Sequence, residues 1–187
     1  RGFERALATG RLTVEGSLSL TASAAFLKRN QNRTPEQQVA ATHGILEMYR
    51  DKGVKVEQAL IMAAFGCNFE GDVPVARVVE LAGQLLDIAA AHGVALKRIS
   101  LGDTMAWATP LAVKRVVGAV RERFPGIDVA LHLHDTRGMG IANACAGLAM
   151  GVTHFDASVI SGITIADLQA GRSVPPTPPT PLLASDL

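Results

Sequence analysis

The spacing of hydrophobic residues along the chain switches repeatedly between two periods, one typical of strands and one typical of helices. Hydrophobic and polar residues alternate over residues 12–20, as in a strand with two different faces. The segment from Thr34 to Gly53 instead begins with an N-cap, a proline in the first turn and a capping glutamine, which predicts a helix. The same succession then repeats. It predicts further strands over residues 54–62, 97–101, 129–134 and 152–158, and further helices beginning near Pro74, Thr109 and Ile141.

Five strands that alternate with helices through short connections predict a parallel sheet with right-handed crossovers, an α/β fold. A doubly wound nucleotide-binding sheet carries a glycine-rich turn after its first strand, and the sequence has neither G-x-G-x-x-G nor a P-loop. We therefore predict a (β/α)8 TIM-barrel type fold that is incomplete, with about five of the eight βα units. Residues 1–159 would form this partial barrel domain. Residues 160–187 are rich in proline and would form a disordered C-terminal tail.

Composition excludes several classes of protein. Of the 187 residues, 48% are hydrophobic and 19% are charged, which is ordinary for an α/β domain. The net charge is +1 and the basic residues are scattered, so we expect no nucleic-acid partner. No apolar stretch approaches the roughly 20 residues that span a bilayer, and the start at Arg1 has no signal-peptide character, which predicts a cytoplasmic protein without a membrane partner. Cys67 and Cys145 stand far apart and are expected to be reduced.

Polar side chains gather where three consecutive predicted strands end, and barrel enzymes place their chemistry at this edge. His132 and His134 are two apart, so a strand would project both to the same side, where two imidazoles suit a divalent metal. A His-x-His pair by itself is more often a hydrogen-bonded or solvated pair than a metal site, but three converging strand ends favour a site. The polar residues at these ends are Ser100, Asp103, His132, His134, Asp156 and Ser158.

Several of the neighbouring residues have two interpretations. Asp103 either belongs to the site or caps the turn that follows its strand. Asp135 is a candidate for orienting a histidine ring or binding substrate, and Asp156 either joins the pocket or pairs with a polar neighbour. Trp107 either shields the site or packs. Cys145 lies between alanines on a predicted helix and is expected in the core.

Three segments resemble hydroxymethylglutaryl-CoA lyases in order and spacing: ISLGDT at residues 99–104, HLHDTRG at residues 132–138 and MGVTHFDASV at residues 150–159. The resemblance runs from about residue 2 to residue 159 and includes FLKRN at residues 26–30 and GCNFEG at residues 66–71. It places the chain in a wider group of metal-dependent barrel lyases and synthases. Biotin-dependent carboxyltransferase domains share the Asp-Thr pair after the second histidine.

The resemblance implies cleavage of the acyl-CoA substrate 3-hydroxy-3-methylglutaryl-CoA to acetyl-CoA and acetoacetate, with a divalent cation, Mg2+ or Mn2+, as cofactor. It implies that His132 and His134 are metal ligands. It further implies that His132 and Asp103 are catalytic, and that Ser100, Asp103 and Thr104 bind substrate.

The sequence also departs from the family pattern. The family's Arg-Asp-Gly and Gly-Gly-Cys-Pro motifs find no match before Arg1 or after Val159, and Arg137 stands in place of an aromatic residue. We therefore expect a truncated lyase with little or no activity, in which exposed sheet edges favour association into homo-oligomers. The alternatives are a non-catalytic fragment with a partner-binding role, or a related acyl-CoA lyase or synthase of the same barrel family.

Overall fold

A computed structural model describes residues 2–11 and 14–156 of the chain. The predicted proline-rich tail, the domain boundary at residue 159 and Ser158 lie outside these residues. None of the helices within them combines the length and hydrophobicity that crossing a membrane requires.

The centre of the fold is a five-stranded sheet in which all neighbouring strands are parallel. The strands follow one another across the sheet in chain order, as in the wall of a (β/α) barrel. This confirms the predicted parallel α/β architecture with part of a barrel. In spatial order the strands are β1 (Gly16–Thr21), β2 (Val56–Met62), β5 (Arg98–Gly102), β6 (Asp128–His132) and β7 (His154–Asp156).

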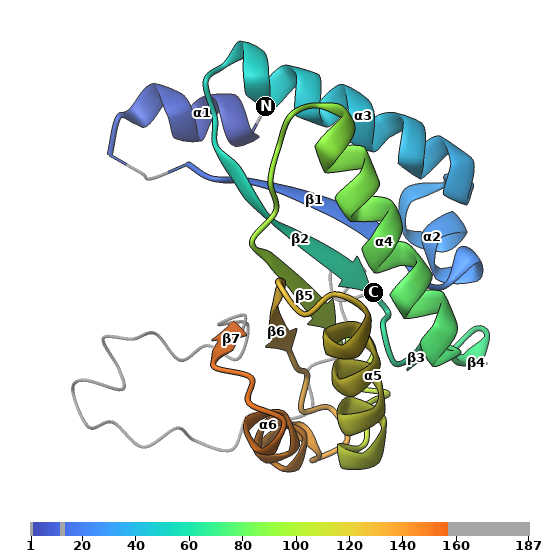
Figure 1. Cartoon of the computed structure of the whole chain (residues 1–187). Helices are drawn as coiled ribbons and strands as arrows, with labels where there is room; N and C mark the ends of the chain where they lie inside the picture. Colours follow the sequence, from blue (N-terminus) through green and yellow to red (C-terminus); the bar gives the residue numbers. More distant parts are fainter. Residues whose placement is uncertain (1, 12–13, 157–187) are drawn as a thin grey trace, which may run out of the picture.

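Each of the four connections between these strands contains a helix, and α3, α4 and α5 lie along one side of the sheet (Figure 1). The predicted starting signals are present: Thr34 and Gln37 form a capping box, and the Thr109 side chain accepts from the backbone N–H of Ala112. These helices are α3 (Pro35–Asp51), α4 (Val75–Ala91), α5 (Pro110–Arg123) and α6 (Gly140–Ala149).

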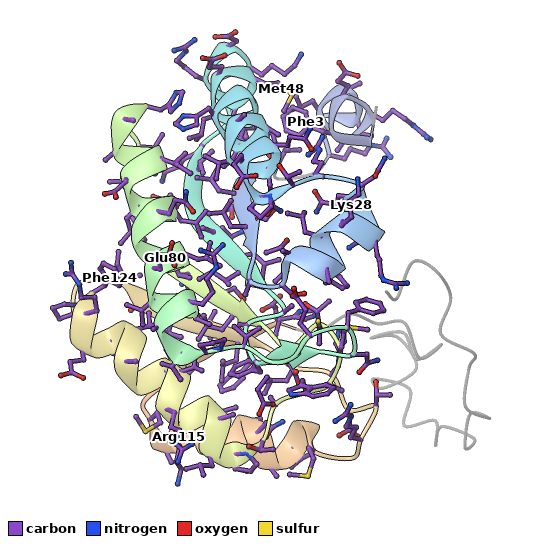
Figure 2. All side chains as sticks on the ribbon, turned by 90° about the vertical axis from the view of Figure 1, so that its right-hand side faces the viewer. Phe3, Lys28, Met48, Glu80, Arg115 and Phe124 are labelled. Carbon is purple, nitrogen blue, oxygen red and sulfur yellow. The ribbon has the colours of Figure 1, made fainter. Side chains whose placement is uncertain are left out.

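Four short elements were not predicted from the sequence, because their few residues carry too little periodicity. The first of them is the helix α1, where Phe3 contacts the ring of Tyr49 on α3 with 5.3 Å between ring centroids (Figure 2). The other three surround the carboxyl ends of β1 and β2. The four are α1 (Gly2–Thr9), α2 (Ala24–Gln31), and an antiparallel pair made of β3 (Gly66–Cys67) and β4 (Gly71–Asp72).

The alternation along the strands separates a buried face from a polar one. The helix-facing side chains are at most 1% exposed and form the main core: Leu18, Leu20, Ala59, Ile61, Ile99, Leu101, Val129 and Leu131. The opposite face carries polar residues around a cavity of about 400 Å³. There Arg98 and His154 are linked, with 2.6 Å between a guanidinium nitrogen and the imidazole Nε2.

The two cysteines differ in their surroundings. Cys67 is buried against Phe26, Ala63 and Met105, and its thiol donates to the hydroxyl of Ser23. Cys145 is exposed, so its predicted core position is wrong. The buried side of helix α6 consists of Asn143, Ala146 and Gly147. Its larger hydrophobic residues Ile141 and Leu148 are exposed, like Cys145.

Candidate functional site

The rings of His132 and His134 meet at the carboxyl end of β6. Their Nε2 atoms are 3.1 Å apart and their ring centroids 5.1 Å apart. The two side chains therefore do share one side, as the spacing predicted. The strand itself ends at His132 rather than continuing to His134. Its last carbonyl accepts from the backbone N–H of Asp103 at 2.8 Å, after which the chain leaves the sheet.

The hydrogen bonds of both rings determine which nitrogen carries the proton. His132 Nδ1 lies 2.9 Å from Asp156 Oδ2, and His134 Nδ1 lies 3.0 Å from the carbonyl oxygen of Thr104. A carbonyl and an ionised carboxylate only accept, so each Nδ1 carries a hydrogen and donates it. In the neutral rings both Nε2 lone pairs then face each other across 3.1 Å. Both Nε2 lone pairs are therefore directed toward the space where a cation would bind between the rings.

The spacing of the two Nε2 atoms fits a metal ion. With metal–nitrogen bonds of about 2.1 Å, two adjacent ligands of an octahedron lie about 3.0 Å apart. Both Nδ1 atoms are also held by an outer oxygen partner, which is the usual arrangement of ligating histidines. Among the described residues no group of three or more His, Cys, Asp or Glu side chains converges in this way. The pair therefore offers two nitrogen atoms, whereas Mg2+ requires six ligands and favours oxygen.

Asp103 lies beside this pair and is 1% exposed. Its Oδ1 accepts from the backbone N–H groups of Trp107 at 2.6 Å and Ala108 at 2.9 Å, which confirms the turn-capping interpretation for that oxygen. Its Oδ2 is buried and has no partner among the described groups. Burial raises the pKa of the Asp103 carboxyl, against the opposing effects of the two N–H donors and the electrostatic influence of His134 and Arg137.

We expect Asp103→Asn to leave the protein at least as stable as the wild type at pH 7. Because the folded-state pKa of Asp103 is raised, its ionised form lowers the free energy of unfolding at neutral pH. That cost disappears as the pH falls below the unfolded-state pKa of about 3.9. Thermal melts of both proteins between pH 3 and pH 8 measure the difference. If the stability difference between Asp103→Asn and the wild type does not shrink as the pH falls, the expectation is wrong. A difference that came only from the uncharged amide would not depend on pH.

The other predicted site residues lie at two different depths. Thr104 is at the rim, where its Oγ1 accepts from the backbone N–H of Ala63 at 2.8 Å while its carbonyl holds His134. Ser100 lies deeper, on the polar face of β5 and opposite Ala130 in the sheet register. Its hydroxyl is buried without a partner among the described groups and lines the cavity on that face. The structure thus brings Asp103, Thr104 and the two histidines together and leaves Ser100 below them.

The carboxylate that holds His132 is not the adjacent one. Asp135 Oδ1 accepts from the backbone N–H of Gly140 at 2.6 Å and so caps α6, which overturns its predicted role in orienting a ring. Asp156 performs that role because β7 places it opposite His132 in the parallel register. The interpretation of Asp156 as the partner of a polar neighbour is therefore confirmed.

A second group at the rim was not identified as a unit from the sequence. The Trp107 indole donates to Asp72 Oδ1 at 2.5 Å and stacks under the guanidinium of Arg137, 4.5 Å from the ring centroid. The indole packs directly on Gly66, whose position leaves no room for a Cβ. In the sequence, Gly66 is only one glycine of a glycine-rich loop. Its contact with Trp107, 41 positions later, follows only from the tertiary structure.

The chain is similar to known proteins over most of its length. The HMGL-like family model matches residues 1–164. A hydroxymethylglutaryl-CoA lyase of Bacillus subtilis (strain 168) is 34% identical over 84% of this chain and 50% of its own length. A mitochondrial hydroxymethylglutaryl-CoA lyase of Rattus norvegicus is 35% identical over 85% of this chain and 46% of its own.

A solved structure agrees with these matches. An HMG-CoA lyase from Acinetobacter baumannii, in complex with coenzyme A and 3-methylmalate, superimposes with a TM-score of 0.68 at 29% identity, covering 92% of this chain and 53% of that one. The chain thus spans about half the length of the relatives it matches. Because the family model matches most of the chain, the chain belongs to the HMGL-like family.

Proposed function

We propose that this chain acts in the metal-assisted cleavage of 3-hydroxy-3-methylglutaryl-CoA to acetyl-CoA and acetoacetate. The observation that carries the proposal is the pair of Nε2 atoms 3.1 Å apart, with each opposite ring nitrogen held by an oxygen acceptor. The names of the relatives support the substrate, and one of their structures holds coenzyme A.

His132 and His134 would hold a divalent cation, Mg2+ or Mn2+. Such an ion polarises the oxygens of the substrate and lowers the pKa of its tertiary hydroxyl group. The chain's own contribution is positioning: Asp156 and the Thr104 carbonyl fix both rings, so the ligand nitrogens are in place before an ion arrives. Ser100 and Thr104 would contact the substrate, Ser100 through its unpartnered hydroxyl.

Proton transfer is assigned to Asp103 and His132. The tertiary hydroxyl loses its proton, the carbon–carbon bond breaks to release acetoacetate, and the electron pair of that bond forms the enolate of acetyl-CoA, which then takes a proton. Asp103 has one carboxyl oxygen without a partner among the described groups, and burial favours its protonated form. It is therefore suited to exchanging a proton beside the histidine pair.

We expect acetoacetate release from 3-hydroxy-3-methylglutaryl-CoA to depend on added metal. The purified chain would show a low rate with Mn2+ or Mg2+, no rate above the blank after EDTA, and recovery when metal is restored, because the two imidazoles alone hold an ion weakly. The measurement couples acetoacetate to a dehydrogenase, with circular dichroism to confirm folding. A folded chain whose trace matches the blank at every metal concentration would overturn catalysis and leave the partner-binding alternative.

Three further assignments remain predictions. Residues 1–159 are proposed as the barrel domain and residues 160–187 as a separate tail. A cytoplasmic location and association into homo-oligomers are likewise proposed, and size-exclusion chromatography of the chain tests the second of these.

A further inference from the structure

The guanidinium of Arg137 is held in place at the rim of the candidate site. It stacks on Trp107 at 4.5 Å from the ring centroid, and one of its nitrogens donates to Asn68 Oδ1 at 3.4 Å. The backbone beneath it is a turn in which Gly138 N–H donates to the carbonyl of Asp135. Arg137 is exposed, but its conformation is restrained by these two contacts and by the hydrogen-bonded turn.

The ring that carries Arg137 is itself fixed. The indole of Trp107 donates to Asp72 Oδ1, its backbone N–H donates to Asp103 Oδ1, and its face rests on Gly66. A planar cation stacked on an anchored ring loses little freedom when it binds a planar anion. The contact with Trp107 also connects Arg137 directly to the residue that hydrogen-bonds Asp103.

Arg137 forms no direct ion pair with a carboxylate among the described residues. Two carboxylates of the rim accept from donors other than Arg137: Asp72 from the Trp107 indole, and Asp135 from the N–H of Gly140. Arginine has five N–H donors, and Asn68 takes one. A guanidinium with unused N–H donors at the edge of a site is suited to bind an anionic group of the ligand.

We propose that Arg137 binds the free carboxylate of the dicarboxylic acyl group and so selects acyl-CoA substrates that carry a second acid group. This inference rests on the proposed function and names the part of the substrate that this chain recognises. Arg137 stacks on Trp107, whose backbone N–H donates to Asp103, so its charge lies close to a residue to which we assign the proton transfer. The phosphates of coenzyme A lie at the far end of the pantetheine arm, away from the reacting carbons. The acyl carboxylate is therefore the anion that this position favours.

Trp107 provides the test, because it is the single tryptophan of the chain and touches Arg137. Its fluorescence is recorded in EDTA while the chain is titrated with 3-hydroxy-3-methylglutaryl-CoA, with 3-hydroxy-3-methylbutanoyl-CoA, which lacks the second acid group, and with coenzyme A. We expect the diacid thioester to bind about tenfold more tightly than the monoacid thioester. Arg137→Gln should remove that advantage and leave the other two affinities unchanged, and calorimetry repeats the comparison without relying on fluorescence.

Matched variants separate charge from stacking. Arg115→Gln on α5, whose side chain is exposed on the outer side of that helix, should bind all three ligands as the wild type does (Figure 2). Arg137→Lys keeps the charge but loses the planar donors, so it should retain only part of the advantage. If Arg137→Gln loses affinity equally for all three ligands, the residue binds a coenzyme A phosphate and the inference is wrong. The inference is also wrong if Arg137→Gln loses no affinity for the diacid thioester. It is equally wrong if neither thioester changes the fluorescence or the heat signal of the wild type. No metal and no turnover is needed, so failure here is distinct from failure of metal-dependent catalysis.

Discussion

His134→Ala is expected to remove the metal response of this chain and to lower metal-dependent acetoacetate release by about 100-fold or more. Loss of an outer partner of a ligating histidine already costs about 10- to 100-fold in affinity or activity, and this change removes the ligand itself. His132 would then be the remaining nitrogen ligand among the described residues, with no second Nε2 at 3.1 Å. Mn2+ binding is followed by electron paramagnetic resonance and activity by acetoacetate release.

His43→Ala is the matched control for this prediction. His43 on α3 also pairs with a second histidine, with 2.9 Å between its Nδ1 and His92 Nε2, but that pair lies between two helices on the outer side of the sheet. Its loss should leave Mn2+ binding and activity unchanged. Equal metal responses in wild type, His134→Ala and His43→Ala, with all three folded by circular dichroism, would contradict the assignment of His134 as a ligand.

Gly66→Ala is expected to lower the free energy of unfolding by about 3 kcal/mol or more, from backbone strain and overpacking together. The φ angle of Gly66 is +146°, a conformation that residues with a Cβ rarely adopt. An added Cβ would also lie 2.2 Å from Trp107 Cδ1, so the indole would have to move. Urea denaturation measures the loss, and a shift of the Trp107 emission maximum reports the displaced ring.

Gly44→Ala provides the opposite expectation within the same chain. Gly44 lies in the middle of α3, and an added Cβ would meet nothing within 4 Å. Alanine at an exposed helix position is better than glycine by about 0.5–1 kcal/mol, so this variant should be slightly more stable than the wild type. A Gly66→Ala protein as stable as Gly44→Ala would show that Trp107 does not pack on Gly66 as described.

The elements that a local pattern encodes were well predicted. The capping box at Thr34 and the cap at Thr109 marked the starts of α3 and α5, because capping depends on residues only three or four apart. The short α2 and the β3–β4 pair were missed, since two turns of helix and strands of two residues show little periodicity. Cys145 was predicted in the core but is exposed. Helix α6 has hydrophobic residues on both sides, so its sequence does not indicate which side packs against the rest of the protein.

The sequence by itself determined the order of strands and helices, and it determined that His132 and His134 project to one side. Those properties follow from spacings of two to four residues, which backbone geometry converts directly into direction. Only the tertiary structure decided that Asp156, 24 positions away, holds His132 while the adjacent Asp135 caps a helix. It likewise decided that Arg137 lies on Trp107. The physical reason is that register between strands and the paths of the loops, not local spacing, determine which distant side chains meet.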